Sequence, residues 1–174
     1  TSPEEYGDYF AWGETQPKGA YGWENHAYGC AYNQHTKYCN NSEYGLNGFT
    51  DNLNTLEASD DVATQVLGNG ARIPSADEWL ELLDNTTAEW TTVNGVYGCK
   101  FTAANGNSLF LPAAGGRNGS DLDGAGSYGY YWSASLIEDY PYGAWRMFFY
   151  SDCQRVGGYY RGYGQSVRAV RSLN

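Results

Sequence analysis

The chain has 174 residues, of which 41% are hydrophobic and 17% aromatic, and this is enough apolar material for the core of one domain. Its formal net charge of −10 argues against a nucleic-acid partner, because such a protein must neutralise phosphates. No run of about 18 apolar residues is present, so the sequence predicts no transmembrane segment. We expect a single domain over residues 1–174, either by itself or as the C-terminal domain of a longer secreted protein.

The charge is unevenly distributed along the chain. Residues 136–174 contain five Arg and three acidic residues, so this segment carries +2 on an otherwise acidic body. The four cysteines, in a chain rich in Tyr and Gly, are typical of an oxidising compartment. We expect a disulfide between Cys30 and Cys39, which enclose a short polar loop. Cys99 and Cys153 are left open between a second disulfide and free thiols.

The first 56 residues predict long ordered loops, with DYFAWG (8–13) as the best candidate strand. Two helices are expected next. One follows Ser59 as DDVATQVL, with acidic residues in its first turn. The other follows Ser75, and Glu78 three residues later completes a capping box. An apolar stripe at helical spacing makes this second helix the strongest secondary-structure signal in the chain.

Strands are expected after the second helix. Asn94-Gly95 and Asn105-Gly106-Asn107 are hairpin turn signals between alternating or apolar runs. LFLP (109–112) predicts a short buried strand, and GGRNGSDLDGAGSYG (115–129) predicts a glycine-rich loop. The last three strands are expected at YYWSAS, AWRMFFYS and SVRAVR.

The stretch from Tyr140 to Tyr163 has the composition of a binding surface. Nine of its 24 residues are aromatic and three are Arg, and Tyr, Trp and Arg are the residue types that dominate binding energy at interfaces. Side chains alternate along a strand, so Trp145, Met147 and Phe149 are expected to face the core. The alternating set Arg146, Phe148 and Tyr150 is expected to face outward.

The candidate ligand-binding residues share this surface or its flanking loops: Asp139, Tyr140, Tyr142, Arg146, Phe148, Tyr150, Asp152, Arg155, Tyr159, Tyr160 and Tyr163. The alternative is a Tyr-rich sheet that packs against loops or against a neighbouring domain.

Metal sites have weaker signals. Asp51, Asp60 and Asp61 are clustered acids that could hold Ca²⁺, since hard cations take oxygen ligands. EF-hand spacing is absent, however, and acidic residues are expected at a helix N-terminus in any case. His26 and His35 have no Cys-x-x-Cys partner that would indicate zinc. We therefore expect no cofactor, with Ca²⁺ as the open alternative.

Five motifs in order resemble a known group of domains: RIPSADEW, LFLPAAGGR, GSYGYYWSAS, AWRMFF and SVRAVR. They resemble bacterial domains with a C-type-lectin-like fold related to formylglycine-generating enzymes, in particular the major paralogous domain proteins of Bacteroidetes and Fibrobacter. The resemblance covers almost the whole chain. It implies an α+β, C-type-lectin-like fold with two helices, small twisted antiparallel sheets and extensive ordered loops.

The same fold class includes the variable proteins of diversity-generating retroelements, which display a hypervariable face on their last strands. Asp139 to Tyr163 occupies that place here. Randomised adenines in Asn codons do not yield Lys, Glu, Gln, Met or Trp, and between Arg146 and Tyr163 only Met147 and Gln154 belong to this excluded set. The resemblance implies a diversified binding protein.

The expected function is non-catalytic recognition of a protein or glycan ligand at a cell surface. The expected location is extracellular, at the surface of a bacterium or on the virion of its phage, and the oligomeric state is left open. Two alternatives remain. One is an enzyme of the formylglycine-generating type, although only Cys153 lies where that family has its redox cysteine pair. The other is a structural module of a cell-surface assembly.

Overall fold

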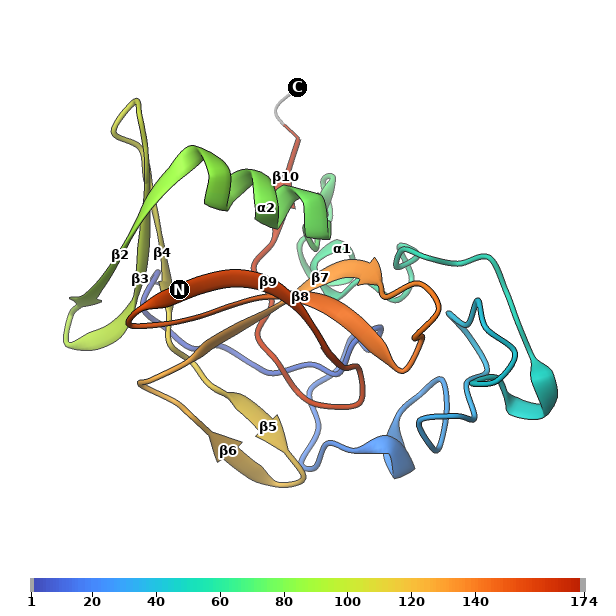
Figure 1. The fold of residues 1–174 in the computed structure, drawn as a ribbon. Coiled ribbons are helices and arrows are strands. Elements are labelled where there is room, and N and C mark those ends of the chain that lie inside the picture. The colour runs from blue at the N-terminus through green and yellow to red at the C-terminus, as the bar shows by residue number, and fades with distance from the viewer. Residues whose placement is uncertain (1, 173–174) are drawn as a thin grey trace.

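The computed structural model describes residues 2–172, and within that range it contains two α-helices, two short 3-10 helices and ten strands (Figure 1). The α+β class with two helices and small antiparallel sheets is thus confirmed. The elements in chain order are η1 (Trp23–Asn25), η2 (Leu46–Gly48), α1 (Val62–Leu67), β1 (Ala71–Arg72), α2 (Ala76–Asn85), β2 (Thr86–Val93), β3 (Val96–Ala103), β4 (Ser108–Pro112), β5 (Gly116–Asn118), β6 (Asp121–Asp123), β7 (Gly129–Leu136), β8 (Gly143–Tyr150), β9 (Cys153–Tyr160) and β10 (Val170–Arg171).

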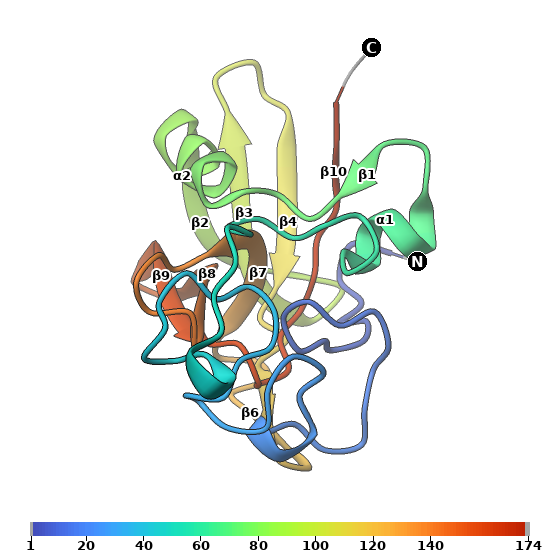
Figure 2. The same ribbon diagram turned by 90° about the vertical axis from the view of Figure 1, so that its right-hand side faces the viewer.

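Two three-stranded antiparallel sheets form the frame, one in the order β2-β3-β4 and the other in the order β7-β8-β9. Two-stranded ribbons, β1-β10 and β5-β6, complete the pairing. Helix α2 lies across one face of the β7-β8-β9 sheet, and the β5-β6 ribbon lies on the other side of it (Figures 1 and 2). In the described part of the chain, no helix is long and apolar enough to cross a membrane.

The strongest local signals produced the expected elements. The Ser75 hydroxyl accepts a hydrogen bond from the Glu78 amide, and the Glu78 carboxylate accepts one from the Ser75 amide, so the capping box is confirmed. Asn94 and Gly95 have φ values of 49° and 81°, as a two-residue turn with both central residues left-handed requires. The α1 helix also forms, but Asp61 is its N-cap, not Ser59.

Other strand predictions were wrong. The segment DYFAWG makes only an isolated bridge between Phe10 and Gln165. The glycine-rich loop contains the β5-β6 hairpin, and SVRAVR contributes only the two residues of β10. Strand β9 was not predicted, because Gly157 and Gly158 interrupt its pattern. It forms because it pairs along its whole length with β8.

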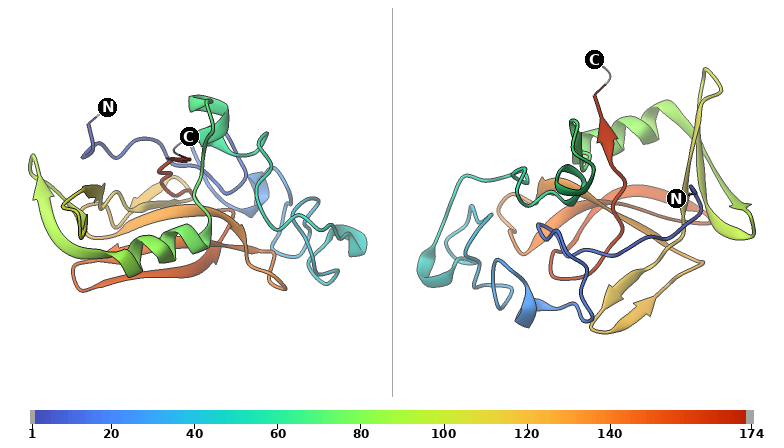
Figure 3. Two further views of the ribbon diagram at one scale, coloured as in Figure 1. Left: turned by 90° about the horizontal axis from the view of Figure 1, so that it is seen from above. Right: turned by 180° about the vertical axis from the view of Figure 1, so that it is seen from behind.

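The core lies on both faces of the β7-β8-β9 sheet. On the face toward α2, Tyr131 and Phe149 pack with Trp79 and Phe101. On the opposite face, Trp132 and residues near the β7-β8 turn pack with side chains from the N-terminal loops. Figure 3 shows these loops extending to one side of the sheet. They cover only part of the second face, and the rest stays open.

The N-terminal loops are held by long-range hydrogen bonds to the sheet. The Trp12 indole donates to the Ser133 carbonyl at 2.8 Å, and the Trp132 indole donates to the Phe10 carbonyl at 2.8 Å. The fully buried Arg161 donates to three loop carbonyls and to His35. These bonds explain how a segment with so little secondary structure keeps one conformation.

Candidate functional site

The part of the β7-β8-β9 sheet that the loops leave open carries the aromatic stretch from the C-terminal region. Residues directly opposite one another on paired strands share a face. Phe148 of β8 lies opposite Tyr130 of β7 and Arg155 of β9. Met147 and Phe149 point the other way and are fully buried, whereas Phe148 is half-buried. The alternation predicted for β8 is therefore confirmed over these residues.

Two residues of β8 differ from the expected exposure. Trp145 was expected in the core but is 36% exposed, because this end of the strand extends past the buried cluster. Arg146 was expected in solvent but is only 8% exposed. Its guanidinium carbon lies 4.3 Å from the centre of the Tyr130 ring and 3.9 Å from the centre of the Tyr159 ring. Aromatic side chains from both neighbouring strands therefore enclose it.

Arg146 is a buried cation. Among residues 2–172 it forms no ion pair, and its Nε has no hydrogen-bond partner. Burial lowers the pKa of Arg146 to about 10, so the side chain is still charged at neutral pH. The two aromatic faces offset part of the desolvation cost, since a cation over a π-system is attracted to it. The remaining N–H groups are available to an outside acceptor.

Two aromatic clusters meet at Arg146. The first, which we call the Phe148 cluster, contains Tyr130 with Phe148, a stacked pair of Tyr128 and Tyr130, and the contact of Tyr128 with Tyr150. The Arg155 guanidinium lies 4.4 Å from the centre of the Phe148 ring. Each ring supports its neighbour, so this half of the surface is a preorganised layer.

The second group, the Tyr160 cluster, lies at the other end of the strands. Tyr160 contacts Tyr159 and Tyr163, and it also contacts Tyr142 from the β7-β8 turn. Two loop residues join from the N-terminal half: Trp23 against Tyr160, and Tyr44 against Tyr142. We call the two clusters together with Arg146 the binding face, and its members are Trp23, Tyr44, Tyr128, Tyr130, Tyr140, Tyr142, Arg146, Phe148, Tyr150, Arg155, Tyr159, Tyr160 and Tyr163.

The two acidic candidates lie at opposite ends of this face. Asp139 is in the β7-β8 turn with φ of 66°, and its carbonyl accepts a hydrogen bond from Asn41. Asp152 is in the β8-β9 turn and accepts one from Ser151. The eight residues of β8 separate them by about 26 Å at the usual rise of a strand. Asp139 and Asp152 therefore cannot contact the same small ligand.

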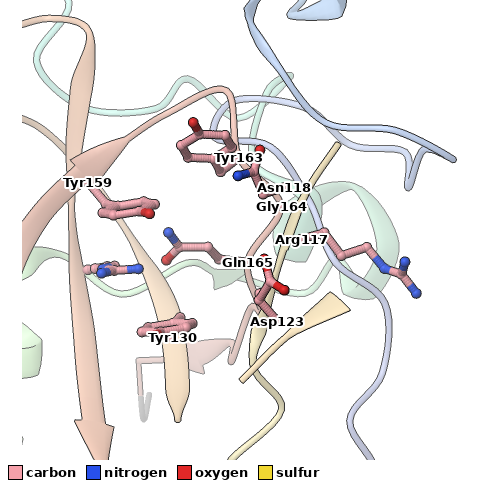
Figure 4. A pocket seen from close by; sticks show the side chains of 10 residues that line it. Arg117, Asn118, Asp123, Tyr130, Tyr159, Tyr163, Gly164 and Gln165 are labelled. Atoms are coloured by element: carbon pink, nitrogen blue, oxygen red, sulfur yellow. The ribbon is translucent and has the colours of Figure 1, made fainter. Parts of the chain in front are cut away.

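A pocket opens beside Arg146, between the binding face and the β5-β6 ribbon (Figure 4). Its volume is about 100 Å³. Tyr130 and Tyr159 form two of its walls, and Figure 4 shows the carboxamide of Gln165 directed toward the gap between them. Gln165 is 1% exposed, and within residues 2–172 neither its Nε2 nor its Oε1 has a hydrogen-bond partner. Asp123 lies on the far side of the pocket.

The carboxylates of the metal candidates accept hydrogen bonds from the protein's own donors. Asp51 accepts hydrogen bonds from the amides of Tyr38 and Cys39. Asp61 accepts from the Thr64 and Ile73 amides. No cluster of three or more metal-ligating side chains occurs in the range that the structure describes.

Asp60 is the centre of a separate network. Its carboxylate accepts hydrogen bonds from the Tyr28 and Tyr38 hydroxyls and from Lys37. Burial alone would raise the pKa of Asp60, but these hydrogen bonds outweigh it and hold the pKa below its usual value. This arrangement links loop residues to the start of α1 and needs no cation.

The predicted disulfide is wrong. All four cysteines are free thiols. The loop turns back on itself through a bridge between Gly29 and His35, which leaves Cys30 exposed in the loop. Cys39 is buried, and its sulfur donates to the Asn41 carbonyl instead. The open question about Cys99 and Cys153 is answered in the same way, since both remain unpaired.

Several members of the site were missed at the sequence level. Tyr130 could have been found, because it lies on the outward side of the predicted strand YYWSAS. Gln165 carried no signal, since it lies just before the expected strand SVRAVR, and Asp123 lay within the expected glycine-rich loop. Trp23 and Tyr44 join the face only through tertiary packing of the loops.

One comparison with known proteins finds a match that includes the strands of the binding face. A family model described as a domain of unknown function (DUF8237) matches residues 91–170. The match runs from the end of β2 into β10 and includes all three strands of the binding face. No curated protein and no solved structure matches the chain.

Proposed function

We propose that this chain is a non-catalytic recognition domain that binds a protein or glycan ligand through the binding face. The observation that carries the proposal is Arg146, a cation held between two tyrosine rings with no acidic partner among residues 2–172. Burying a charge without a partner is costly. A site that keeps such a charge next to open aromatic surface is suited to a ligand that supplies the missing acceptor.

The surface around Arg146 has the residue types of binding hot spots. Tyr140, Tyr159 and Tyr160 are 53%, 39% and 45% exposed. A group of large exposed aromatic side chains on the surface of a monomeric protein is typical of an interaction site. Tyrosines provide large contact areas with few rotatable bonds, so ordering them costs little entropy. The ring contacts within each cluster reduce that cost further, because the rings are already in place before binding.

We also propose the finer fold assignment, a C-type-lectin-like domain acting outside the cytoplasm on a bacterial surface or a phage virion. The order of the motifs supports it, as does the position of the binding face on the last long strands. On the opposite side of β8, the side chains of Met147 and Phe149 belong to the core cluster that includes Trp79 of α2.

Diversification by a retroelement belongs to the same proposal. It predicts a near-copy of the coding segment for residues 139–171 close to the gene, differing mainly at adenines. Sequencing the neighbouring DNA checks this. Absence of such a copy would remove diversification but leave ligand recognition untouched.

The enzymatic alternative has less support. Cys99 is 0% exposed within the core, and Cys153 is a free thiol next to Tyr150 in the strand pairing. A redox pair of the formylglycine-generating type needs two accessible cysteines together. The arrangement of the binding face, by contrast, needs no reacting group.

The test is a triple replacement on the binding face. We expect Phe148→Ala, Tyr150→Ala and Tyr160→Ala together to weaken capture of a ligand found on glycan or surface-protein arrays by at least about 100-fold. The reason is that each aromatic hot spot contributes about 2 kcal/mol or more. Binding is measured by biolayer interferometry, and folding is checked by thermal unfolding.

The matched control replaces three exposed apolar residues on the helices. Val66, Leu67 and Leu80 are 70%, 52% and 44% exposed and lie on α1 and α2. Their replacement by Ala should leave ligand capture unchanged. Equal losses in both variants would contradict the proposal. A face variant that alters only self-association in sedimentation would instead identify the surface as a structural interface.

A further inference from the structure

We infer that the pocket beside Arg146 binds the carboxylate of an acidic sugar of the uronic acid type, which rests on the proposed function and specifies its ligand. The pocket is formed where the β5-β6 ribbon faces the outer side of β7-β8-β9. Its volume of about 100 Å³ corresponds to roughly three water molecules. It therefore accommodates an end group of a larger ligand.

Gln165 gives the first independent indication of a ligand. The side chain is 1% exposed, yet neither amide atom is hydrogen-bonded to any residue within 2–172. A buried amide without partners is destabilising, and native proteins satisfy the great majority of such groups. Figure 4 shows the amide directed into the pocket. One donor and one acceptor are thus presented to whatever enters.

Arg146 gives the second indication and defines the charge of the ligand. Its guanidinium lines the same pocket, and its Nε has no partner in the described chain. The Tyr130 and Tyr159 rings lie close to the guanidinium, so a ligand has to approach the guanidinium along its edge. Paired N–H groups on one edge match the two oxygens of a carboxylate. A carboxylate would also accept from the Gln165 amide.

The rest of the pocket favours a sugar over an acidic peptide. Asp123 and Asn118 line its far side. The Asp123 carboxylate would repel a second acidic side chain, but it accepts hydrogen bonds from sugar hydroxyls. Tyr159 and Tyr163 present aromatic rings at the opening, 5.5 Å apart between centroids, against which the C–H face of a pyranose can pack. A carboxylated hexose has a carboxylate for Arg146, hydroxyls for Asp123 and a C–H face for the two tyrosine rings.

The experiment compares matched sugars by isothermal titration calorimetry. The methyl glycosides of glucuronic and galacturonic acid are titrated against methyl glucoside and methyl galactoside. We expect at least about tenfold tighter binding of an acidic sugar than of its neutral counterpart. A third arm uses N-acetylglutamate amide, which has the carboxylate but no hydroxyls for Asp123 and no pyranose face, and should bind at least about tenfold more weakly than the acidic sugar. Binding of that compound in place of the sugars, or equal affinity for the acidic and neutral sugars, would overturn the inference.

Two variants connect the binding to the pocket. Gln165→Leu should raise the melting temperature by about 2 °C or more, because it removes a buried unsatisfied amide. The same variant should weaken acidic-sugar binding about tenfold. Arg146→Met should abolish the preference for the acidic sugar. Arg171→Met, at an exposed position on β10, is the control and should change neither property.

Unchanged sugar binding in Gln165→Leu and Arg146→Met would place the sugar elsewhere and contradict the inference. The outcome is distinguishable from failure of the proposed function. If the array ligand still depends on Phe148, Tyr150 and Tyr160 while no acidic sugar binds, only the pocket assignment is overturned.

Discussion

Replacing Arg161 with Met should lower the free energy of unfolding by about 4 kcal/mol. The guanidinium is fully buried and donates to the Tyr38 carbonyl at 2.7 Å and the Lys37 carbonyl at 2.8 Å. Exchanging a buried charge for an apolar side chain can be neutral when its partners are also removed. Here the carbonyls remain, and each buried acceptor without a partner costs about 1 to 3 kcal/mol.

The backbone around Tyr38 adds to this loss. Tyr38 has φ of 55°, a left-handed conformation that disfavours residues other than Gly. Arg161 donates a hydrogen bond to the Tyr38 carbonyl, and the Asp51 carboxylate accepts one from the Tyr38 amide at 2.8 Å. Loss of Arg161 therefore removes one of the two hydrogen bonds that keep Tyr38 in this conformation. We expect the N-terminal loops to lose order together.

Urea denaturation followed by tryptophan fluorescence measures the effect. Arg171→Met removes an exposed arginine and should change the free energy of unfolding by less than about 0.5 kcal/mol. The loss of unfolding free energy in Arg161→Lys should lie between the losses in Arg161→Met and Arg171→Met. The reason is that an ammonium keeps the charge but cannot reach all the carbonyl acceptors. A loss below about 1 kcal/mol in Arg161→Met would show that the loops are held by other contacts.

Stability should also fall markedly below pH 6.5 because of two buried histidines. Burial, reinforced by the Arg161 charge, lowers the pKa of both His26 and His35 to about 3. In the unfolded chain both take up protons near pH 6.5, whereas the folded chain takes them up only near pH 3. Stability is therefore present above pH 6.5 and is lost as the pH falls toward 3. At pH 5 the loss is about 2 kcal/mol for each histidine.

The hydrogen bonds explain why these rings stay neutral. His26 Nε2 lies 3.0 Å from the Trp12 carbonyl, so this nitrogen carries the proton, and Nδ1 accepts from the Tyr28 amide. His35 Nδ1 lies 3.0 Å from an Arg161 nitrogen and acts as acceptor. Protonation of either Nδ1 replaces an accepted hydrogen bond with a clash between two donors.

The pH effect is measured by urea denaturation at pH 7.5 and pH 5. His26→Gln keeps a donor for Trp12 and His35→Asn keeps an acceptor for Arg161, and neither side chain titrates. The double variant should lose most of the difference between the two pH values, even if it is less stable at both. The carboxylates titrate at lower pH and contribute little in this window. A wild-type protein equally stable at pH 5 and pH 7.5 would contradict this explanation.

Local signals explain what the sequence could predict. The α2 capping box needs only Ser75 and Glu78, three residues apart. The β2-β3 turn needs only Asn94 and Gly95. The two faces of β8 follow from the alternation of side chains along a strand, because Met147 and Phe149 have to share a face. In each case the determining residues are neighbours in the sequence, so no knowledge of the tertiary structure was required.

Tertiary packing determines the rest. Arg146 has the position that alternation gives it, but its burial depends on rings from β7 and β9. Gln165 becomes part of the pocket only because the chain after β9 turns back beside β5. The Cys30–Cys39 disulfide failed for a similar reason: proximity in sequence does not show where a loop reverses. The candidate site was therefore predictable as a strand face, but not as a pocket.

The footprint of the bound ligand tests the central claim most directly. Amide and side-chain NMR shifts are recorded on addition of the ligand identified by array capture. We expect the largest changes at the binding face, centred on Tyr130, Arg146, Phe148 and Tyr159, with little change on α1. Changes concentrated on α1 or the β2-β3-β4 sheet, with an unaffected Arg146, would contradict the assignment of this face as the site of recognition.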